Sequence, residues 1–311
     1  MKEATGEDIS KEELGGPTVA LPSGVIHNVA DTDEAVLDDI RQYLSYFPSS
    51  AWSYPPTRLY DEEAGLRPTP ELLDIISRDN RNIYDMRTVL DVVFDETDWF
   101  EVQPKFGPAV ICALAHLGGY PVAVVANQPT ELAGSIDSDA ADKAAHFIMV
   151  ADSFHLPIVF LADNPPGMLP GSHSERNGVL RSGGARMFAA QTAATTLKLH
   201  VTLRKAFGFG SMVMSLLGGF DNQVATFAYP GATMGAMSAA ALSRASHADE
   251  DVTEILKNME LEASYRSAGS LGFDELISPE ETRNSLILAL QRGIFSRQEA
   301  AEPVSRTVIT P

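Results

Sequence analysis

A short apolar run that ends at a rigid loop constrains the fold of this chain most. Residues 157–160, Pro-Ile-Val-Phe, lead into the loop Leu-Ala-Asp-Asn-Pro-Pro-Gly-Met-Leu-Pro-Gly at positions 161–171. The run is typical of a buried strand, and proline ends it because proline has a fixed φ and no N–H. Residues 173–198 then carry a glycine-rich patch and helix formers. A strand, a loop and a helix in this order let backbone N–H groups face a ligand, although proline and glycine alone would indicate only a tight turn.

Composition limits the class of protein. The 311 residues are 44% hydrophobic and 21% charged, which is ordinary for a globular chain with one large core or two smaller ones. The formal net charge is −19 and no dense block of Lys and Arg occurs. Nucleic acid and anionic membranes are therefore poor partners, whereas local N–H groups could still bind a small anion.

Cysteine and histidine give no sign of a metal site. The single cysteine, Cys112, lies in an apolar run and is expected in the core, and no histidine pair has the spacing of a metal motif. The N-terminus lacks the apolar segment of a signal peptide, and the longest apolar stretch, residues 109–126, is interrupted by His116 and Pro121. We therefore expect a soluble, cytoplasmic protein that holds no metal.

Apolar periodicity predicts an α/β protein. Residues 31–47 place Val36, Ile40 and Leu44 on one side of an amphipathic helix with one buried face. Further helices are expected at 70–76, 85–94, 139–154, 173–198, 211–217, 233–242, 251–265 and 279–295, and strands at 99–102, 109–115, 121–126, 157–162, 199–203 and 223–228. A hairpin of two strands followed by repeated βα units suggests a layered α/β spiral. A Rossmann fold is disfavoured because no G-x-G-x-x-G follows the first strand.

Three segments could present backbone donors. Asn127 and Gln128 follow a strand, residues 163–171 form the proline loop, and residues 204–214 run from a strand end into a helix that opens on Gly208 and Gly210. Unpaired N–H groups at a helix start can stabilise an oxyanion. The alternative to a ligand site is that the two glycines only make the start of this helix flexible. No Ser-His-Asp order or carboxylate pair stands out, so the chemistry indicated is that of backbone donors.

Six landmarks in a fixed order carry a family resemblance. They are Tyr84-Asp85-Met86, Val125-Ala126-Asn127-Gln128-Pro129, Gly134-Ser135-Ile136-Asp137, the loop 163–171, Arg204-Lys205-Ala206-Phe207-Gly208 and Pro279-Glu280-Glu281-Thr282-Arg283. Together they resemble the carboxyltransferase β subunit of biotin-dependent acyl-CoA carboxylases of the propionyl-CoA and acetyl-CoA type. The chain is similar to the C-terminal part only, because its first residues resemble the end of that family's N-terminal domain.

The resemblance implies a crotonase (ClpP/crotonase-like) fold, a spiral of ββα turns. Residues 1–95 would be the tail of the N-terminal domain with a helical and irregular connector, and residues 96–311 the carboxyltransferase C-terminal domain. In this family the N-terminal half binds acyl-CoA, and its oligomers set the N-terminal domain of one subunit against the C-terminal domain of another. The implied partners are a biotin carboxylase and biotin carrier subunit, and an N-terminal counterpart or homo-oligomer mates.

The resemblance also implies the chemistry. Biotin on a separate carrier protein would deliver a carboxyl group to the α-carbon of an acyl-CoA, and the N–H groups of Phe209 and Gly210 would hold the ureido oxyanion. The residues expected to bind biotin or substrate are Asn127, Gln128, Asp163, Pro165, Gly167, Gly171 and Gly208.

Several positions depart from the family pattern. Phe209-Gly210 replaces Gly-Ala, the proline loop is one residue longer, and Thr233 and Ser238 stand where a carboxylate and a glycine are usual. Residues 182–186 resemble the acyl-CoA oxyanion motif of the other half, as coincidence or as a trace of a pseudo-repeat. Two alternatives stay open: a crotonase-like hydratase, isomerase or decarboxylase that uses the same N–H pair, and a non-catalytic scaffold subunit.

Overall fold

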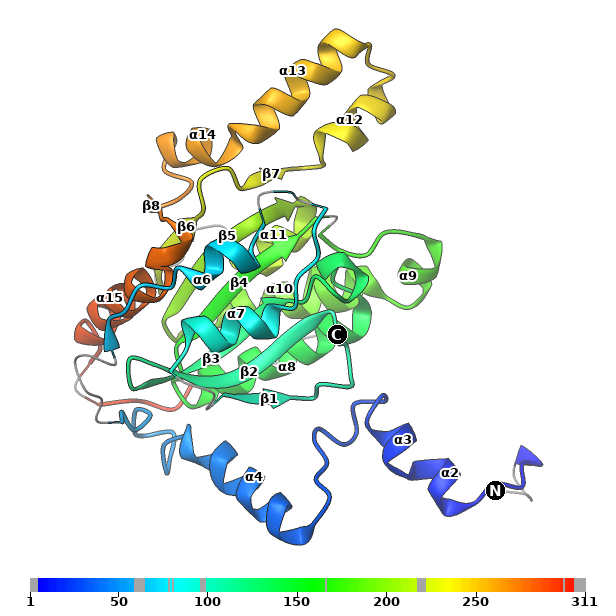
Figure 1. Ribbon diagram of the computed structural model, residues 1–311. Helices are drawn as coiled ribbons and strands as arrows, with labels where there is room; N and C mark the ends of the chain where they lie inside the picture. Colours follow the sequence, from blue (N-terminus) through cyan, green and yellow to red (C-terminus); the bar gives the residue numbers. More distant parts are fainter. Residues whose placement is uncertain are drawn as a thin grey trace.

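An eight-stranded sheet forms the centre of the molecule. The structure is a computed structural model that describes residues 5–58, 65–77, 79, 81–95, 99–165, 167–216, 222–298 and 300–304 (Figure 1). The strands follow the order β1-β2-β3-β4-β5-β6-β8, and β7 pairs with β5. Their bounds are β1 Phe100–Val102, β2 Val110–Leu117, β3 Tyr120–Asn127, β4 Ile158–Asn164, β5 Lys198–Phe207, β6 Gln223–Ala228, β7 Thr233–Gly235 and β8 Glu275–Leu276.

The first three strands are antiparallel and the later ones are parallel. Strands β2 and β3 form the expected hairpin, whose turn residues Gly118 and Gly119 both have positive φ. The Asp95 carboxylate accepts hydrogen bonds from both of their N–H groups, at 2.8 and 2.7 Å. From β3 to β6 each strand pairs in parallel with the next, so their carboxyl ends meet at one edge of the sheet.

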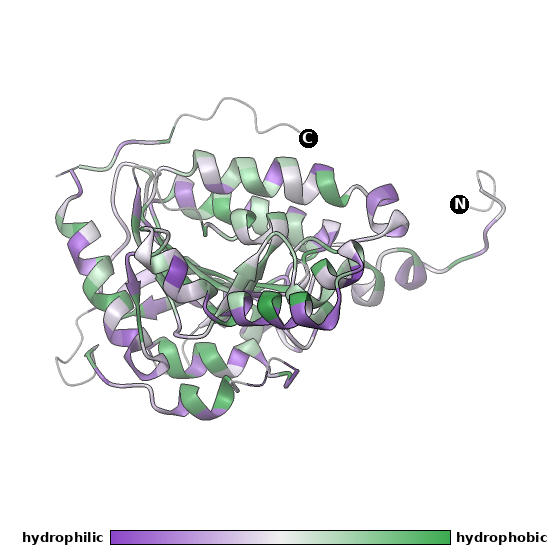
Figure 2. Ribbon diagram, turned by 90° about the horizontal axis from the view of Figure 1, so that it is seen from above, coloured by the Kyte–Doolittle hydropathy of each residue, from purple (hydrophilic) through white to green (hydrophobic). Residues whose placement is uncertain are grey.

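Helices cover both faces of the sheet. Helices α6 (Glu71–Ile75), α7 (Met86–Val93) and α15 (Thr282–Phe295) supply buried residues to the core on one face, and α8 (Ser138–Ser153) and α10 (Phe188–Ala193) to the core on the other. In β3, residues 122 and 124 face the first core and residues 123 and 125 the second, as the pleat requires. The helices carry mixed hydrophobic and hydrophilic residues (Figure 2). The α/β layering predicted from the sequence is confirmed.

Two parts of the chain lie outside these layers. Helices α12 (Ala239–Ser246), α13 (Glu250–Leu261) and α14 (Ala263–Gly269) form an arm between β7 and β8 that projects from the sheet (Figure 1). At the other end of the chain, α2 (Lys11–Gly15) and α3 (Pro17–Ala20) lie apart from the sheet (Figure 1). Helix α4 (Asp33–Ser45) borders β1, where the rings of Tyr43 and Phe100 are in contact. No described helix is long and apolar enough to cross a membrane.

Helix α4 differs from its prediction in one respect. The helix forms where expected, but none of its residues is buried, and Leu37 and Leu44 are 50% and 59% exposed. The predicted burial of one face is not met within this chain, because the segment before the helix and β1 leave that face as an open groove.

Three further predictions need correction. Residues 173–198 do not form one helix: they divide into α9 (Ser172–Arg176), a π-helix at Leu180–Met187, and α10, and β5 begins at Lys198. Gly178, with φ of 82°, separates the first two. Residues 233–242 begin with the short strand β7 rather than a helix, because Thr233 and its neighbours pair with β5. Strand β5 extends to Phe207, so α11 (Gly208–Val213) starts three residues earlier than expected.

The predicted division at residue 95 runs through a shared core. Helices α6 and α7 precede it, yet Leu72 and Leu90 belong to the same buried cluster as the strands. Cys112 is buried as expected, and burial raises the pKa of its thiol to about 12. The domain boundary stays a prediction.

Candidate active site

The loops that follow β3, β4 and β5 meet at the carboxyl edge of the sheet. The buried side chain of Asn127 joins two of them: its Nδ2 donates to the carbonyl of Gly134 at 3.1 Å, and its Oδ1 accepts from the backbone N–H of Asp163 at 3.2 Å. Gly134 has a φ of 82°, and a Cβ there would overlap the carbonyl oxygen of Asp163. Three of the six sequence landmarks are therefore in direct contact.

Backbone hydrogen bonds fix the middle of the proline loop. Ile136 donates to the carbonyl of Gly167 at 2.9 Å, and Leu169 donates back to the carbonyl of Ile136 at 2.8 Å. A side chain on Gly183 of the π-helix would overlap Met168. The loop is thus held between the segment before α8 and the π-helix.

Gly167 brings the loop onto the start of α11. A Cβ on Gly167 would overlap the carbonyl oxygen of Phe207, and a Cβ on Gly210 would overlap the backbone of Gly167. Gly208 begins the helix with a φ of 62°, a conformation that favours glycine. Only the absence of side chains at Gly167 and Gly210 permits this contact.

The start of α11 keeps backbone donors available. Phe207, its N-cap residue, makes no side-chain cap. Among the described residues, the N–H groups of Phe209 and Gly210 find no backbone acceptor. Such N–H groups carry partial positive charge, which favours an anion or a developing oxyanion.

The Phe209 ring lies beside these donors. It is 38% exposed and contacts Phe188 with the ring centroids 5.1 Å apart. A Cβ on Gly184 would come within 3.8 Å of its ring. An aromatic pair from α10 and α11, next to the π-helix, therefore borders the helix start.

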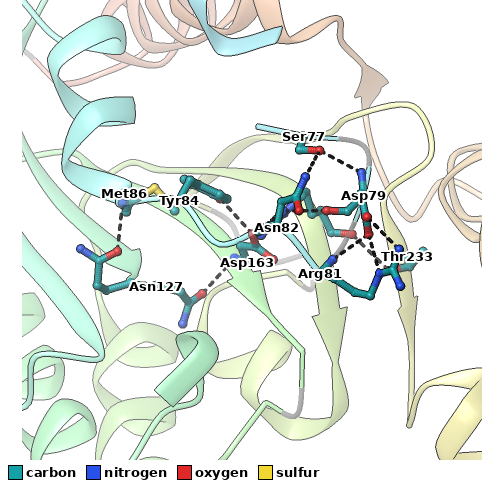
Figure 3. Close-up of polar contacts among 11 residues, drawn as sticks. Ser77, Asp79, Arg81, Asn82, Tyr84, Met86, Asn127, Asp163 and Thr233 are labelled. Carbon is teal, nitrogen blue, oxygen red and sulfur yellow. Dashed lines mark hydrogen bonds and ion pairs between the residues drawn. The ribbon is translucent and has the colours of Figure 1, made fainter. Parts of the chain in front are cut away.

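A buried ionic cluster anchors the first residue of the proline loop (Figure 3). Asp163 Oδ2 accepts hydrogen bonds from the Tyr84 hydroxyl at 2.9 Å and from Arg204 Nε at 2.8 Å. The Arg204 guanidinium also lies 4.6 Å from the centroid of the Tyr84 ring. Asp163 and Arg204 are 1% and 5% exposed. Burial, and then the Asp163 charge, raise the pKa of Tyr84 well above its usual value, so this phenol stays protonated.

Arg204 extends the cluster to the segment before α7. Its Nη1 donates to the carbonyl of Asn82 at 2.7 Å, and its carbonyl accepts from Thr233 Oγ1 at 3.2 Å. Asp163 Oδ1 is buried without a partner among the described residues. One buried carboxylate oxygen of the cluster therefore accepts no hydrogen bond from the described residues.

Comparison with known proteins gives the family. The carboxyl transferase domain matches residues 1–303. The chain belongs to the carboxyl transferase family. It is 36% identical to the carboxyltransferase subunit of propionyl-CoA carboxylase from Haloferax mediterranei, over 94% of this chain and 58% of that protein. It is also 36% identical to the β4 subunit of the biotin-dependent long-chain acyl-coenzyme A carboxylase from Mycobacterium tuberculosis, over 91% and 56%.

The solved structures agree. The transcarboxylase 12S structure with methylmalonyl-coenzyme A and methylmalonic acid bound matches with a TM-score of 0.88 and 32% identity, over 99% of this chain and 60% of that one. The predicted membership and the crotonase-like carboxyltransferase fold are confirmed. The chain spans less than two thirds of the length of the relatives it matches.

The other expected site residues of this carboxyl transferase lie around the same edge. Gln128 is buried and serves α7: its Oε1 accepts from the N–H of Met86 at 2.9 Å and its Nε2 donates to Asp85 at 2.5 Å. Pro165 is half-buried at the near end of the loop. Gly171 stands at the far end, before α9, where a Cβ would meet nothing within 4 Å. No group of three metal-ligating side chains occurs among the described residues.

Sequence reasoning missed the roles of Tyr84 and Arg204. Both belong to carboxyl transferase landmarks, but they lie 79 and 41 positions from Asp163. Local spacing therefore gave no reason to join the three. The only available signal was that each polar residue sits where a predicted strand or helix begins or ends.

Proposed function

We propose that this chain is the carboxybiotin-binding half of a biotin-dependent carboxyltransferase. It would help transfer a carboxyl group to the α-carbon of an acyl-CoA, together with an N-terminal counterpart. One observation carries the proposal: the uncapped start of α11 meets the glycine loop at the edge where the landmark loops converge. Family membership agrees with this assignment.

The residues present suit a flat, polar ring that develops negative charge. Gly167 and Gly210 let the proline loop approach the start of α11, and Gly208 begins that helix with a positive φ. When bound, biotin on its carrier would supply the carboxyl group. The N–H groups of Phe209 and Gly210 would stabilise the oxyanion, and in other enzymes removing one such donor costs about 3 to 4 kcal/mol. The Phe209 ring would narrow the entrance on the biotin side.

The remaining site residues would position the loops. Asn127 joins the loops after β3 and β4, and Pro165, Gly167 and Gly171 set the course of the second loop. Gln128 would hold the start of α7 beside them. We assign Asp163 to anchoring this loop rather than to proton transfer, since Oδ2 is occupied by Tyr84 and Arg204.

Relatives suggest the class of substrate and partners. One is named for propionyl-CoA, another for long-chain acyl-coenzyme A, and the transcarboxylase 12S structure holds methylmalonyl-coenzyme A. We infer that an acyl-CoA is the acceptor, and that a biotin carboxylase and a biotin carrier supply the carboxyl group.

The exposed side of α4 suggests where the N-terminal counterpart docks. Helix α4 and β1 border a cavity of about 290 Å³ lined by apolar side chains that include Ile40, Tyr43 and Phe100. The sequence before α4 resembles the end of an N-terminal carboxyltransferase domain, so an N-terminal counterpart would lie next to this groove.

The reverse reaction tests the proposal. Carboxyl transfer from methylmalonyl-CoA or malonyl-CoA to free biotin is measured for the chain alone and after mixing with an N-terminal carboxyltransferase half. Activity is expected only on mixing. Phe209→Pro and Phe209→Ala form a matched pair, because both remove the ring but only proline removes the N–H. The proline variant should be slower than the alanine variant by about a hundredfold or more.

Two results would count against the proposal. A stable mixed complex without activity would favour the scaffold alternative. Equal rates for the two variants would show that the N–H of Phe209 is not an oxyanion donor. Proline at position 210 is a poorer probe, because its ring would also collide with the backbone of Gly167.

A further inference from the structure

A cavity of about 430 Å³ lies on the side of the sheet that carries α6, away from the α11 site. It opens between α6, the ends of β5 and β6, and the arm that contains α13 and α14. Its lining includes Leu73, Ile76, Arg204, Tyr229, Leu261 and Tyr265. The volume falls within the range of small-molecule sites, about 300 to 1,000 Å³.

The walls of this cavity are mainly apolar. Leu73 and Ile76 come from α6 and the residue after it, Leu203 from β5, and Leu261 from the end of α13. Leu73 and Leu261 are 48% and 58% exposed, so the apolar surface reaches solvent. The Tyr229 hydroxyl is already paired with Thr282 at 2.6 Å. These walls suit a hydrocarbon chain, whose burial is favourable in proportion to its area.

One charged side chain lines the cavity among the described residues, and its charge is balanced. Arg204 donates through Nε to Asp163 and through Nη1 to Asn82, whereas Nη2 reaches no acceptor among the described residues. A ligand carboxylate would meet the Asp163 charge behind Arg204, in a chain with a net charge of −19. A cation would meet Arg204 itself. An uncharged ligand with a hydrogen-bond acceptor fits best.

We propose that this cavity binds an uncharged amphiphile. Its hydrocarbon chain lies between α6 and the arm, and its hydroxyl or carbonyl oxygen accepts a hydrogen bond from Arg204. Arg204 also anchors the proline loop through Asp163, but the binding experiment needs no carboxyl transfer, so its outcome is independent of the proposed function.

Calorimetric titration of the full chain with 1-octanol tests this site. We expect saturable binding with one site per chain. Leu73→Trp and Leu261→Trp should each weaken binding about tenfold or more, because the larger side chain fills the cavity. Both positions are partly exposed, so the variants should fold, and thermal unfolding checks this. Octanoate should bind about tenfold more weakly than 1-octanol, because of its charge.

A variant on the exposed apolar face of α4 tests whether 1-octanol binds in the cavity beside α6 and not on any apolar surface. Leu37→Trp alters α4, where Leu37 is 50% exposed, and should leave 1-octanol binding unchanged. The proposal fails if the wild-type chain shows no saturable binding. It also fails if Leu37→Trp weakens binding while Leu73→Trp does not, or if octanoate binds more tightly than 1-octanol.

Discussion

The carboxyl edge of the sheet and helix α4 differ in whether their side chains are covered by this chain. At the sheet edge, Asp163 and Arg204 are almost fully buried and bonded to each other. On α4, Leu37, Ile40 and Leu44 are all close to half exposed or more, and no residue of the helix is buried. The first region is completed by contacts within this chain. The second exposes an apolar face that a partner could cover.

This contrast separates residues that stabilise the folded chain from residues that a partner would cover. The site that we assign to biotin is built on strands whose packing is internal, so it should be preorganised in the isolated chain. The surface that we assign to the N-terminal counterpart contributes little to the stability of this chain. Substitutions in the two regions should therefore affect different measurements.

Arg204→Leu should have the largest effect on stability. It removes the cation that pairs with a carboxylate that is 1% exposed. Breaking a buried pair by removing one partner costs about 3 to 5 kcal/mol, because the other charge stays buried and uncompensated. Urea unfolding of the isolated chain measures this loss.

Arg266→Leu is the matched control for Arg204→Leu. Arg266 and Glu262 form an ion pair at 2.8 Å on the arm, with both side chains about 60% exposed. Exposed pairs contribute about 0 to 1 kcal/mol. If Arg204→Leu cost no more than Arg266→Leu, the sheet-edge cluster would not be the stabilising unit that its burial implies.

His200 should make the fold sensitive to acid. It is fully buried in β5, with Nδ1 bonded to the carbonyl of Met214 at 2.8 Å and Nε2 to Thr202 Oγ1 at 2.7 Å. Burial lowers its pKa from 6.5 to about 4. Between these values the unfolded chain binds a proton that the folded chain does not, so stability falls as the pH drops below 6.5. The loss from this group approaches about 3 kcal/mol near pH 4.

Urea unfolding between pH 7 and pH 4 measures the His200 effect. His200→Gln should flatten the dependence of the unfolding free energy on pH in this window. His173→Gln, at an exposed position in α9, should leave the dependence as it is in the wild-type chain. An unchanged slope in His200→Gln would assign the acid sensitivity to other groups.

Gly210→Ala should have an intermediate effect. The added Cβ would overlap the backbone of Gly167, so the proline loop must move away from α11. Overpacking of this kind costs about 1 to 3 kcal/mol. Hydrogen exchange of the backbone amides in the loop 163–171 should become faster. Gly269→Ala, where a Cβ would meet nothing within 4 Å, should change neither stability nor exchange. Slow exchange retained in Gly210→Ala would mean that the loop accommodates the methyl group.

Local sequence patterns predicted the layers of this fold well, because each helix or strand in them is determined by residues that are close together in the sequence. The hairpin of β2 and β3 and helix α8 both follow from periodicity or short spacing. The division of residues 173–198 and the strand β7 depend on contacts with β5 and the proline loop, which no local pattern contains. The same limit applies to the site. The landmarks named Tyr84, Asp163 and Arg204 separately, but only folding brings the three together.

Leu37→Ser on α4 should have the smallest effect on the isolated chain and a large one on assembly. Because Leu37 is half exposed, its replacement should change the unfolding free energy by about 0.5 kcal/mol or less. Association with an N-terminal carboxyltransferase half, measured by analytical ultracentrifugation, should weaken markedly. Ile255→Ser, on the arm and 57% exposed, controls for loss of any exposed apolar side chain. If Leu37→Ser destabilised the isolated chain by several kcal/mol, α4 would be packed on its own chain. If association were unchanged, the N-terminal half would dock elsewhere, and the contrast between the two regions would no longer separate folding from assembly.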